Sequence, residues 1–270
     1  MRTADATITT KRRRTAAIPL PVPRQPVDQA PQVVVLAAGM GTRLGRTLPK
    51  PLTPLCDGRS IMQQQLDGLR AVLGESVSVT AVVGYRAKAV MRAQSELRFA
   101  FNPDYARTNT SQSLLRALRS SLPGGVLWLN GDVVFDPAVL ELTLPFLRAD
   151  ESFVCVDTST VADEEVKYTL DADGYIAELS KTVVGGLGEA VGINYVSAAD
   201  KPVLIEHLAR CADQDYFERG METAIQHAGV RFRPIDISAY RATEVDMPED
   251  LDRANAQLLA ATSRLTGAAG

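Results

Sequence analysis

The sequence predicts an α/β protein with a three-layer, Rossmann-like architecture, in which helices cover both faces of a mixed, mostly parallel sheet. The main observation is that apolar strands alternate with helix-periodic segments between residues 33 and 132. A second observation is a glycine-rich turn directly after the first strand. The third is composition, because 270 residues with 46% hydrophobic and 23% charged residues are typical of a globular domain with an ordinary core.

In the first half of the chain after residue 31, a unit of one strand followed by one helix repeats. Residues 33–36 form a continuous apolar run, which is typical of a strand buried on both faces, and residues 61–73 carry apolar side chains at helical spacing. The same alternation continues to a short apolar run before Asn130-Gly131-Asp132. The further elements expected here are strands at 77–83, 97–101 and 126–129 and helices at 87–95 and 111–121.

The second half is more mixed and contains no internal repeat. Short runs rich in β-branched and aromatic residues predict strands, and runs with apolar residues three or four apart predict helices. The strands are expected at 152–156, 167–170, 175–179, 190–196, 230–234 and 240–245, and the helices at 202–211, 221–227 and 248–261.

Residues 1–31 differ from the rest of the chain. Five prolines, and six Lys or Arg against two Asp, give this segment a charge of +4 and a composition typical of an extended, disordered arm. Since the whole chain carries −3, the remainder carries −7, which disfavours nucleic acid as a partner. We therefore expect an arm at 1–31, a single domain at 32–262 and a flexible tail at 263–270.

The supply of cysteine and histidine excludes several kinds of site. Three scattered cysteines suggest neither a disulfide framework nor a zinc site, and we expect a reducing, cytoplasmic location. The only two histidines, His207 and His227, fall in helix-periodic segments and are expected to be structural, so a Ser-His-Asp triad is disfavoured. No apolar run approaches the ~20 residues that cross a bilayer, so no membrane span is expected.

The glycine-rich turn is the first candidate site. Ala37-Ala38-Gly39-Met40-Gly41-Thr42-Arg43-Leu44 follows the first strand, where backbone N–H groups can surround a phosphate. A dinucleotide fingerprint would need Gly or Ala at Leu44 and an acidic residue roughly twenty positions on, and a Walker loop would need Gly-Lys-Ser/Thr. Both are missing, whereas Arg43 and Lys50 place two cations beside the turn.

Five further stretches follow in order along the chain. They are Pro49-Lys50-Pro51-Leu52, Val82-Val83-Gly84-Tyr85, Asn102-Pro103-Asp104-Tyr105 with Thr108-Asn109-Thr110 and Ser113-Leu114, Leu129-Asn130-Gly131-Asp132, and Glu244-Val245-Asp246 before Pro248-Glu249-Asp250-Leu251. Together with the turn they resemble the signature of the nucleoside triphosphate transferases, the pyrophosphorylases that make nucleotide-activated sugars and alcohols. The resemblance covers residues 32–260 and implies the GT-A-like nucleotidyltransferase fold. The short body is most similar to bacterial phosphocholine, aminoethylphosphonate and inositol-phosphate cytidylyltransferases.

The resemblance also implies roles for residues on the nucleotide side. Asp132 and Asp246, each just after a predicted strand, would hold a catalytic Mg²⁺ ion, Arg43 would neutralise the departing pyrophosphate, and Lys50 would lie on the α-phosphate. These four form the expected catalytic set. The expected nucleotide-binding residues are Leu36, Ala37, Ala38, Gly39, Met40, Gly41, Thr42, Arg43, Lys50, Gly84, Tyr85, Asn109 and Ser113. Helix capping by Asn109 and core packing by Tyr85 remain open as alternatives.

The acceptor side is expected in the second half of the chain. The phosphocholine enzymes carry an aromatic residue near the position of Val166, and its absence here disfavours choline as the acceptor. Lys167 beside it suits an anionic or polar acceptor. The expected acceptor-binding residues are Lys167, Lys181, Glu189, Tyr195 and Glu218.

Together with these residues, the resemblance implies a Mg²⁺-dependent nucleotidyltransferase that joins a nucleoside triphosphate, with CTP favoured, to a small phosphate or phosphonate and releases pyrophosphate. Such an acceptor is already ionised near neutral pH, so the reaction needs no strong general base and few histidines. A sugar-1-phosphate uridylyl-, guanylyl- or thymidylyltransferase stays open, as does a nucleotide-binding regulatory homologue without turnover. A dehydrogenase is disfavoured by Leu44, and a homodimer is left open as the oligomeric state.

Overall fold

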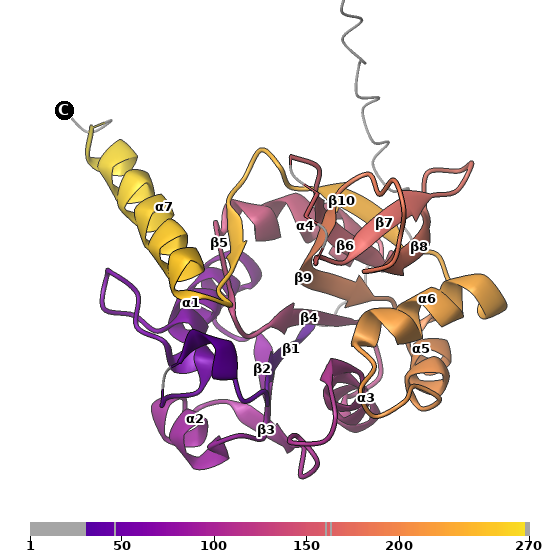
Figure 1. The fold of residues 1–270 in the computed structure, drawn as a ribbon, viewed down its shortest axis with the longest axis horizontal. Coiled ribbons are helices and arrows are strands. Elements are labelled where there is room, and N and C mark those ends of the chain that lie inside the picture. The colour runs from indigo at the N-terminus through magenta and orange to yellow at the C-terminus, as the bar shows by residue number, and fades with distance from the viewer. Residues whose placement is uncertain (1–30, 46, 160, 163, 268–270) are drawn as a thin grey trace, which may run out of the picture.

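The computed structural model describes residues 31–45, 47–159, 161–162 and 164–267, with side chains to residue 260 and without that of Thr42. The predicted arm therefore lies outside the described residues, apart from Pro31. The chain forms a mixed sheet covered by helices on both faces (Figure 1), which confirms the predicted α/β class. Within the described residues no helix is both long and apolar enough to span a membrane.

Seven strands form the main path of the sheet, in the order β10-β6-β9-β4-β1-β2-β3. β9 runs antiparallel to both of its neighbours, whereas the other neighbouring pairs on this path are parallel. The bounds are β1 Gln32–Ala37, β2 Ser78–Val83, β3 Arg98–Phe101, β4 Val126–Asn130, β6 Phe153–Asp157, β9 Glu189–Val196 and β10 Arg233–Asp236. A hairpin of β7 (Lys167–Leu170) and β8 (Ile176–Ser180) joins the sheet through β9.

Two hydrophobic cores lie on opposite faces of the sheet, because successive side chains of a strand point to opposite faces. In β1, Val33 and Val35 pack with α1 (Ile61–Leu73), α2 (Ala87–Ala93) and α4 (Ala138–Arg148). Val34 and Leu36 pack with α3 (Thr110–Ser120), α5 (Lys201–Leu208) and α6 (Phe217–Ala228) on the other face. The sheet and the helices on its two faces are the three layers that the sequence predicts.

A third, smaller core lies beside the sheet. The antiparallel strands β5 (Val133–Phe135) and β11 (Ala242–Glu244) pair with each other, and α7 (Pro248–Gly267) follows β11. The buried side chains of this core come from the segment after the glycine turn, the start of α1, β5, the residue after β11 and the start of α7. They are Leu44, Leu55, Ile61, Val134, Val245, Leu251 and Ala254. The arrangement carries residues 244–246 back to the end of β4.

The predicted elements differ from the structure at a few places. β5 and α4 were not predicted, and α7 runs beyond the expected end at Ala261 into the predicted tail. The strand expected at 230–234 begins only at Arg233, because Gly229 ends α6 with a φ of +69° and Val230 donates back to the Ala224 carbonyl at 3.2 Å. Gly229 and Val230 therefore terminate α6 and do not belong to a strand.

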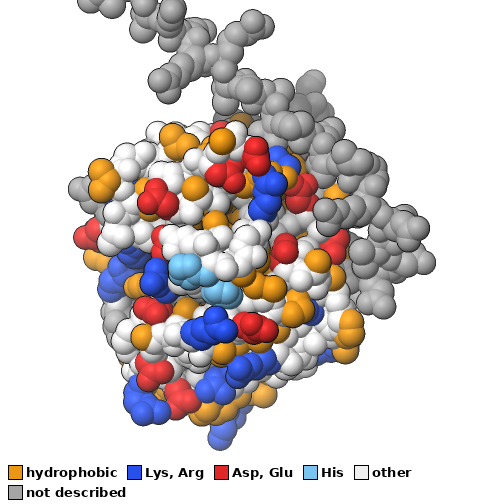
Figure 2. All heavy atoms as spheres, turned by 90° about the vertical axis from the view of Figure 1, so that its right-hand side faces the viewer, with side chains coloured by type: hydrophobic (Ala, Val, Ile, Leu, Met, Phe, Trp, Pro, Cys, Tyr) orange, Lys and Arg blue, Asp and Glu red, His pale blue; other side chains and the backbone are white. Residues whose placement is uncertain are grey.

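The face formed by α5 and α6 carries Lys or Arg and Asp or Glu side by side (Figure 2), with no large area of one charge on the part shown. The two histidines lie on these helices. His207 is buried and its Nδ1 lies 3.0 Å from the Thr223 hydroxyl of α6, as expected for a structural histidine.

Candidate active site

A cavity of about 590 Å³ lies beyond the carboxyl ends of β1 and β4, the edge where α/β sheets generally bind ligands. The segments after these two strands supply one wall, and α3, α6 and the segment after β11 supply others. Residues expected in the site that line this cavity are Leu36, Ala37, Gly39, Met40, Gly41, Arg43, Lys50, Asn109, Asp132, Lys181, Glu218 and Asp246. The structure therefore brings expected residues from both halves of the chain to one cavity.

The glycine turn is shaped to admit a lysine side chain. Gly41 has a φ of +58°, and a Cβ on it would lie 3.1 Å from Cγ of Lys50. Gly131 closes the turn from the other side, since its N–H donates to the Leu36 carbonyl at 3.0 Å and a Cβ there would meet that oxygen at 2.6 Å. Gly41 therefore permits the close approach of Lys50, and Gly131 that of Leu36.

Lys50 lies between two carboxylates that are far apart in the sequence. Its ammonium donates to Asp132 Oδ2 at 2.9 Å and to Asp246 Oδ1. Burial opposes the charge of Lys50, but Asp132 and Asp246 outweigh this effect and raise its pKa above the ordinary value. Arg43, which is 60% exposed, forms an ion pair with Asp246 Oδ2 at 2.6 Å. The structure thus brings together the four residues of the expected catalytic set.

Glu244 is a site residue that the sequence reasoning missed. Carboxylate oxygens of Asp132, Glu244 and Asp246 lie within 4.8 Å of one another. Burial, together with the two aspartates, raises the pKa of Glu244 well above its ordinary value. The available signal was the spacing of Glu244 and Asp246, since residues two apart in an extended segment point to the same side.

The donor set fits a hard divalent cation. Such cations prefer carboxylate oxygens, and three of these converge here. In addition, Asp132 Oδ1 is buried and has no hydrogen-bond partner among the described residues. An unpaired buried oxygen is costly, and a bound cation would remove that cost.

Backbone pairing fixes the carboxylates relative to each other. Glu244 pairs with Val133 across β11 and β5, and the N–H of Val245 donates to the Asp132 carbonyl at 2.9 Å. Asp250, in the first turn of α7, accepts the N–H of Asp246 at 2.9 Å. The cluster therefore depends on the small sheet that sequence analysis did not predict in full.

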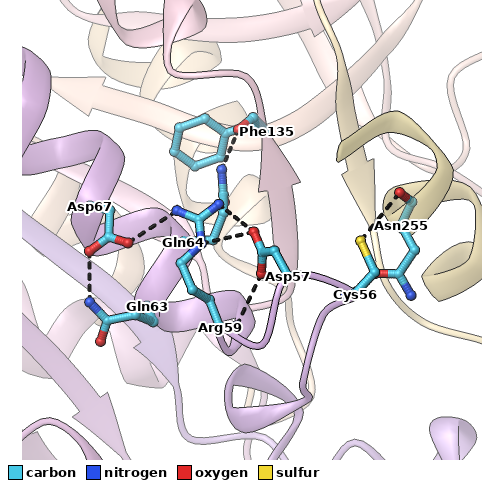
Figure 3. A network of polar contacts seen from close by, with 8 residues as sticks. All are labelled: Cys56, Asp57, Arg59, Gln63, Gln64, Asp67, Phe135 and Asn255. Atoms are coloured by element: carbon cyan, nitrogen blue, oxygen red, sulfur yellow. Dashed lines mark hydrogen bonds and ion pairs between the residues drawn. The ribbon is translucent and has the colours of Figure 1, made fainter. Parts of the chain in front are cut away.

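A polar network ties the loop between the short 3₁₀ helix Lys50–Leu52 and α1 to β5 and α7 (Figure 3). The N–H of Cys56 donates to Asn255 Oδ1 in α7 at 2.8 Å, and Gln64 of α1 donates to the Phe135 carbonyl at 2.6 Å. Arg59 forms ion pairs with Asp57 and Asp67 in the same network. These contacts hold the segment that follows Lys50 against α7, the helix that follows Asp246.

The predicted nucleotide wall is only partly exposed to the cavity. Asn109 lines it and also caps α3, accepting the Thr110 N–H at 2.8 Å. Gly84 and Tyr85 instead support the glycine turn, because the Tyr85 N–H donates to the Ala38 carbonyl at 3.0 Å. Ser113 is buried, and its hydroxyl accepts from Asn102 at 3.1 Å. Tyr105, which the sequence reasoning left out of the site, lines the cavity.

Three of the expected acceptor residues are placed elsewhere. Tyr195 lies at the opposite end of β9, where its hydroxyl donates to Asp150 at 2.7 Å and its ring stacks on Phe153. Because β9 runs antiparallel to β4, its carboxyl end is remote from the cavity. Lys167 and Glu189 are paired across β7 and β9 and do not line the cavity. The expectation that these three residues bind the acceptor is therefore not supported, because none of them lines the cavity.

The other two expected acceptor residues, Lys181 and Glu218, do line the cavity. Lys181 is exposed, and its ammonium lies 4.9 Å from the ring centre of Tyr216. Glu218 is 8% exposed, in the first turn of α6, and burial raises its pKa to about 7, an effect that Lys181 partly opposes.

Replacing Glu218 by Gln should stabilise the fold near pH 8 and not near pH 5, by on the order of 2–4 °C or more in Tm. The folded chain keeps the Glu218 proton to a higher pH than the unfolded chain, so stability falls as the pH rises from 4.5 to about 7. Thermal unfolding at both pH values measures this. Glu164→Gln, at an exposed residue of the same cavity, should change neither midpoint.

The fold and this constellation of residues define an α/β nucleotidyltransferase-type protein. Residues 33–186 match the model of the MobA-like NTP transferase domain, and the chain belongs to this family. It is 31% identical over 245 residues to the CMP-5'-(3-aminopropyl)phosphonate synthase of Streptomyces rubellomurinus, an alignment that covers 83% of this chain and 38% of that relative. A second relative, the bifunctional protein GlmU of a Picosynechococcus species, is 37% identical over 105 residues, 37% of this chain and 22% of the relative. The chain thus spans well under half the length of both relatives.

Solved structures share the fold. The inositol-1-phosphate CTP transferase from T. maritima superposes with a TM-score of 0.69 at 16% identity, covering 85% of this chain and 96% of that one. The CTP:phosphocholine cytidylyltransferase from Streptococcus pneumoniae gives a TM-score of 0.68 at 16% identity, covering 85% and 100%.

Proposed function

We propose that this protein is a Mg²⁺-dependent nucleotidyltransferase that transfers the cytidylyl group of CTP to a small phosphate or phosphonate and releases pyrophosphate. One observation carries the proposal: a single cavity combines the glycine turn with Arg43, Lys50 and the carboxylate cluster. A cytidylyl group and a phosphonate acceptor are supported by the name of the Streptomyces relative, a CMP-phosphonate synthase, and CTP by the names of the two structural neighbours.

In the proposed reaction, an acceptor oxygen attacks the α-phosphorus of CTP, and the bond from that phosphorus to the bridging oxygen of pyrophosphate breaks. The acceptor is ionised near neutral pH, so the chain needs to position and neutralise charge more than to remove a proton. Backbone N–H groups of the segment 39–42 would hold the β- and γ-phosphates. Lys50 would stabilise charge on the α-phosphate, and Arg43 charge on pyrophosphate.

Asp132, Asp246 and Glu244 would hold Mg²⁺, which when bound neutralises phosphate charge and orients the triphosphate. Asn109 would contact the nucleotide, and Lys181 and Glu218 the acceptor, since all three line the cavity. Gly84, Tyr85 and Ser113 would act on the nucleotide side by shaping the glycine turn and α3.

A sugar-1-phosphate acceptor is the second candidate. It is favoured by a likeness to a UDP-glucose pyrophosphorylase structure, with a TM-score of 0.66 at 14% identity. A nucleotide-binding protein without turnover is disfavoured, because binding alone does not require Lys50 and the carboxylates together.

A matrix of nucleoside triphosphates against phosphorylated alcohols, phosphonates and sugar 1-phosphates, scored by pyrophosphate release, tests the proposal. We expect release with CTP and a small phosphate or phosphonate, and none without Mg²⁺. Release only with UTP, GTP or dTTP and a sugar 1-phosphate would favour the second candidate. No release with any combination would contradict both.

Phosphocholine should be at least about tenfold poorer in kcat/KM than the best small acceptor of this matrix. A quaternary ammonium is held by open aromatic faces and cannot donate a hydrogen bond. Here Val166 stands at the acceptor end, and the ring of Tyr216 already has the Lys181 ammonium 4.9 Å from its centre. Equal turnover of phosphocholine would contradict this view of the acceptor pocket, although nucleotidyl transfer would stand.

We also propose that the protein works in the cytoplasm without a nucleic-acid partner. Its three cysteines are free, as a reducing compartment requires, and the segment after residue 31 has a net charge of −7. Homodimerisation is left to measurement.

A further inference from the structure

The ammonium of Lys50 lies between two of the three carboxylates that would hold a divalent ion. It donates to Asp132 Oδ2 at 2.9 Å and to Asp246 Oδ1. These aspartates belong, with Glu244, to the cluster whose carboxylate oxygens lie within 4.8 Å of one another. A divalent ion bound by the same carboxylates would lie beside the ammonium, where like charges repel. Lys50 and the ion therefore compete for the two aspartates.

Both carboxylate oxygens of Asp246 are already paired with cations of the chain. Oδ1 accepts from Lys50, and Oδ2 forms the ion pair with Arg43 at 2.6 Å. The side chain of Lys50 is 12% exposed and that of Arg43 is 60% exposed, so solvent screens the contacts of Lys50 less. Of the carboxylate oxygens of the two aspartates, Asp132 Oδ1 is the one without a partner among the described residues. The two aspartates can therefore bind a divalent ion together only after Lys50 has left them.

The backbone of Lys50 is held in place, whereas its ammonium is at the end of a flexible stem. Lys50 begins the 3₁₀ helix Lys50–Leu52, and Pro51 beside it is buried. Its Cγ lies 3.1 Å from the position that a Cβ on Gly41 would take, in the turn proposed to hold the triphosphate. A lysine ammonium is a compact charge on four rotatable carbons. Rotation of the stem alone therefore carries the charge from the aspartates to a nearby phosphate oxygen.

We propose that Lys50 is an internal counter-ion that keeps the cation site weak for divalent ions in the free protein, until a bound triphosphate draws its ammonium away from Asp132 and Asp246. The competition between Lys50 and a divalent ion concerns this chain alone. Release of Lys50 by a triphosphate rests on the proposed nucleotidyl transfer. It adds an order of binding to that reaction, because the divalent ion is held tightly only together with the nucleotide.

The first test is a Mn²⁺ titration without nucleotide, followed by electron paramagnetic resonance. Lys50→Met removes the ammonium and keeps most of the stem. It should bind Mn²⁺ at least about tenfold more tightly than the wild type, because two carboxylates lose their internal partner. Arg43→Met removes an equal charge from Asp246 at an exposed position and should tighten binding by less than about threefold. Lys88→Met, at an exposed lysine of α2, should leave the affinity unchanged.

The second test follows the ammonium group itself, by nitrogen-15 NMR of the wild-type protein with labelled lysine. Lys50→Arg keeps the positive charge and identifies the Lys50 signal by its absence. Mg²⁺ alone should leave this signal in place, whereas Mg²⁺ with a non-hydrolysable CTP analogue should shift it. Because the signal is read in the wild type, this test does not depend on the stability of Lys50→Met.

Equal Mn²⁺ affinity of the wild type and a folded Lys50→Met variant, verified by its Tm, would overturn the inference. Equal tightening by Arg43→Met would overturn it as well, since total charge and not occupancy would then set the affinity, and so would a shift of the Lys50 signal by Mg²⁺ without nucleotide. Each of these results is compatible with pyrophosphate release and leaves the proposed function standing. Conversely, absence of pyrophosphate release would contradict the proposed function and leave the competition between Lys50 and Mn²⁺ intact.

Discussion

Asp132→Asn and Asp246→Asn are each expected to reduce kcat by roughly 10²-fold or more, which corresponds to several kcal/mol of lost transition-state stabilisation. Both carboxylates belong to the cluster within 4.8 Å, and each also contacts Lys50. An amide is a weaker ligand for a hard divalent cation and does not neutralise the lysine. Steady-state pyrophosphate release at saturating CTP and Mg²⁺ measures the loss.

Asp252→Asn is the control for these variants, because Asp252 is exposed in the neighbouring α7 and lies outside the cavity lining. It should leave kcat unchanged. Each variant should keep a cooperative unfolding transition, and titration with Mn²⁺ followed by electron paramagnetic resonance should show weakened metal binding only in the two cluster variants. Near wild-type kcat in either cluster variant would refute the metal assignment.

Lys50→Ala should lower kcat by roughly 10²-fold while changing CTP affinity much less. The contact of a cation with the transferring phosphoryl group strengthens as charge develops there, so its loss is felt mainly in the transition state. Lys50 is also the residue for which the chain makes room at Gly41. Comparison of kcat with the Kd for CTP, measured in the absence of acceptor, separates the two effects.

Lys88→Ala, at an exposed lysine of α2, provides the control and should alter neither quantity. Arg43→Ala should have a smaller effect than Lys50→Ala, because the Arg43 side chain is 60% exposed and its charge is therefore screened by solvent. If Lys50→Ala changed only the affinity for CTP, Lys50 would be a ground-state contact and not a catalytic residue.

Much of the fold could be predicted from the sequence because its signals are local. The continuous apolar run of β1 and the helical spacing of α1 fix those elements without reference to distant residues. α4 was missed because Pro145 stands inside it, and proline normally interrupts a helix. β5 is only three residues long and exists through its pairing with β11, more than a hundred residues away.

In the candidate site, too, residues with local sequence signals could be predicted, whereas residues placed by distant strand pairing could not. Asp132, just after β4, and Lys50, in the segment that follows the glycine turn, could be placed because their motifs are local. Tyr195 could not, since its place depends on the direction in which β9 enters the sheet, which no local pattern reports. The sequence signal for the third carboxylate, Glu244, was its spacing from Asp246, whereas its position beside Asp132 depends on the pairing of β5 with β11.

The most direct measurement is a phosphorus-31 NMR spectrum of the wild-type protein incubated with CTP, Mg²⁺ and a small phosphonate acceptor. The proposed cytidylyl transfer predicts two coupled phosphorus signals from a new bridge between the α-phosphorus and the acceptor phosphorus, together with an equal amount of pyrophosphate. Both should be absent with Asp132→Asn on the same time scale. Cleavage of CTP to CDP and phosphate, or unchanged CTP with every phosphate, phosphonate and sugar-1-phosphate acceptor, would contradict nucleotidyl transfer by this chain.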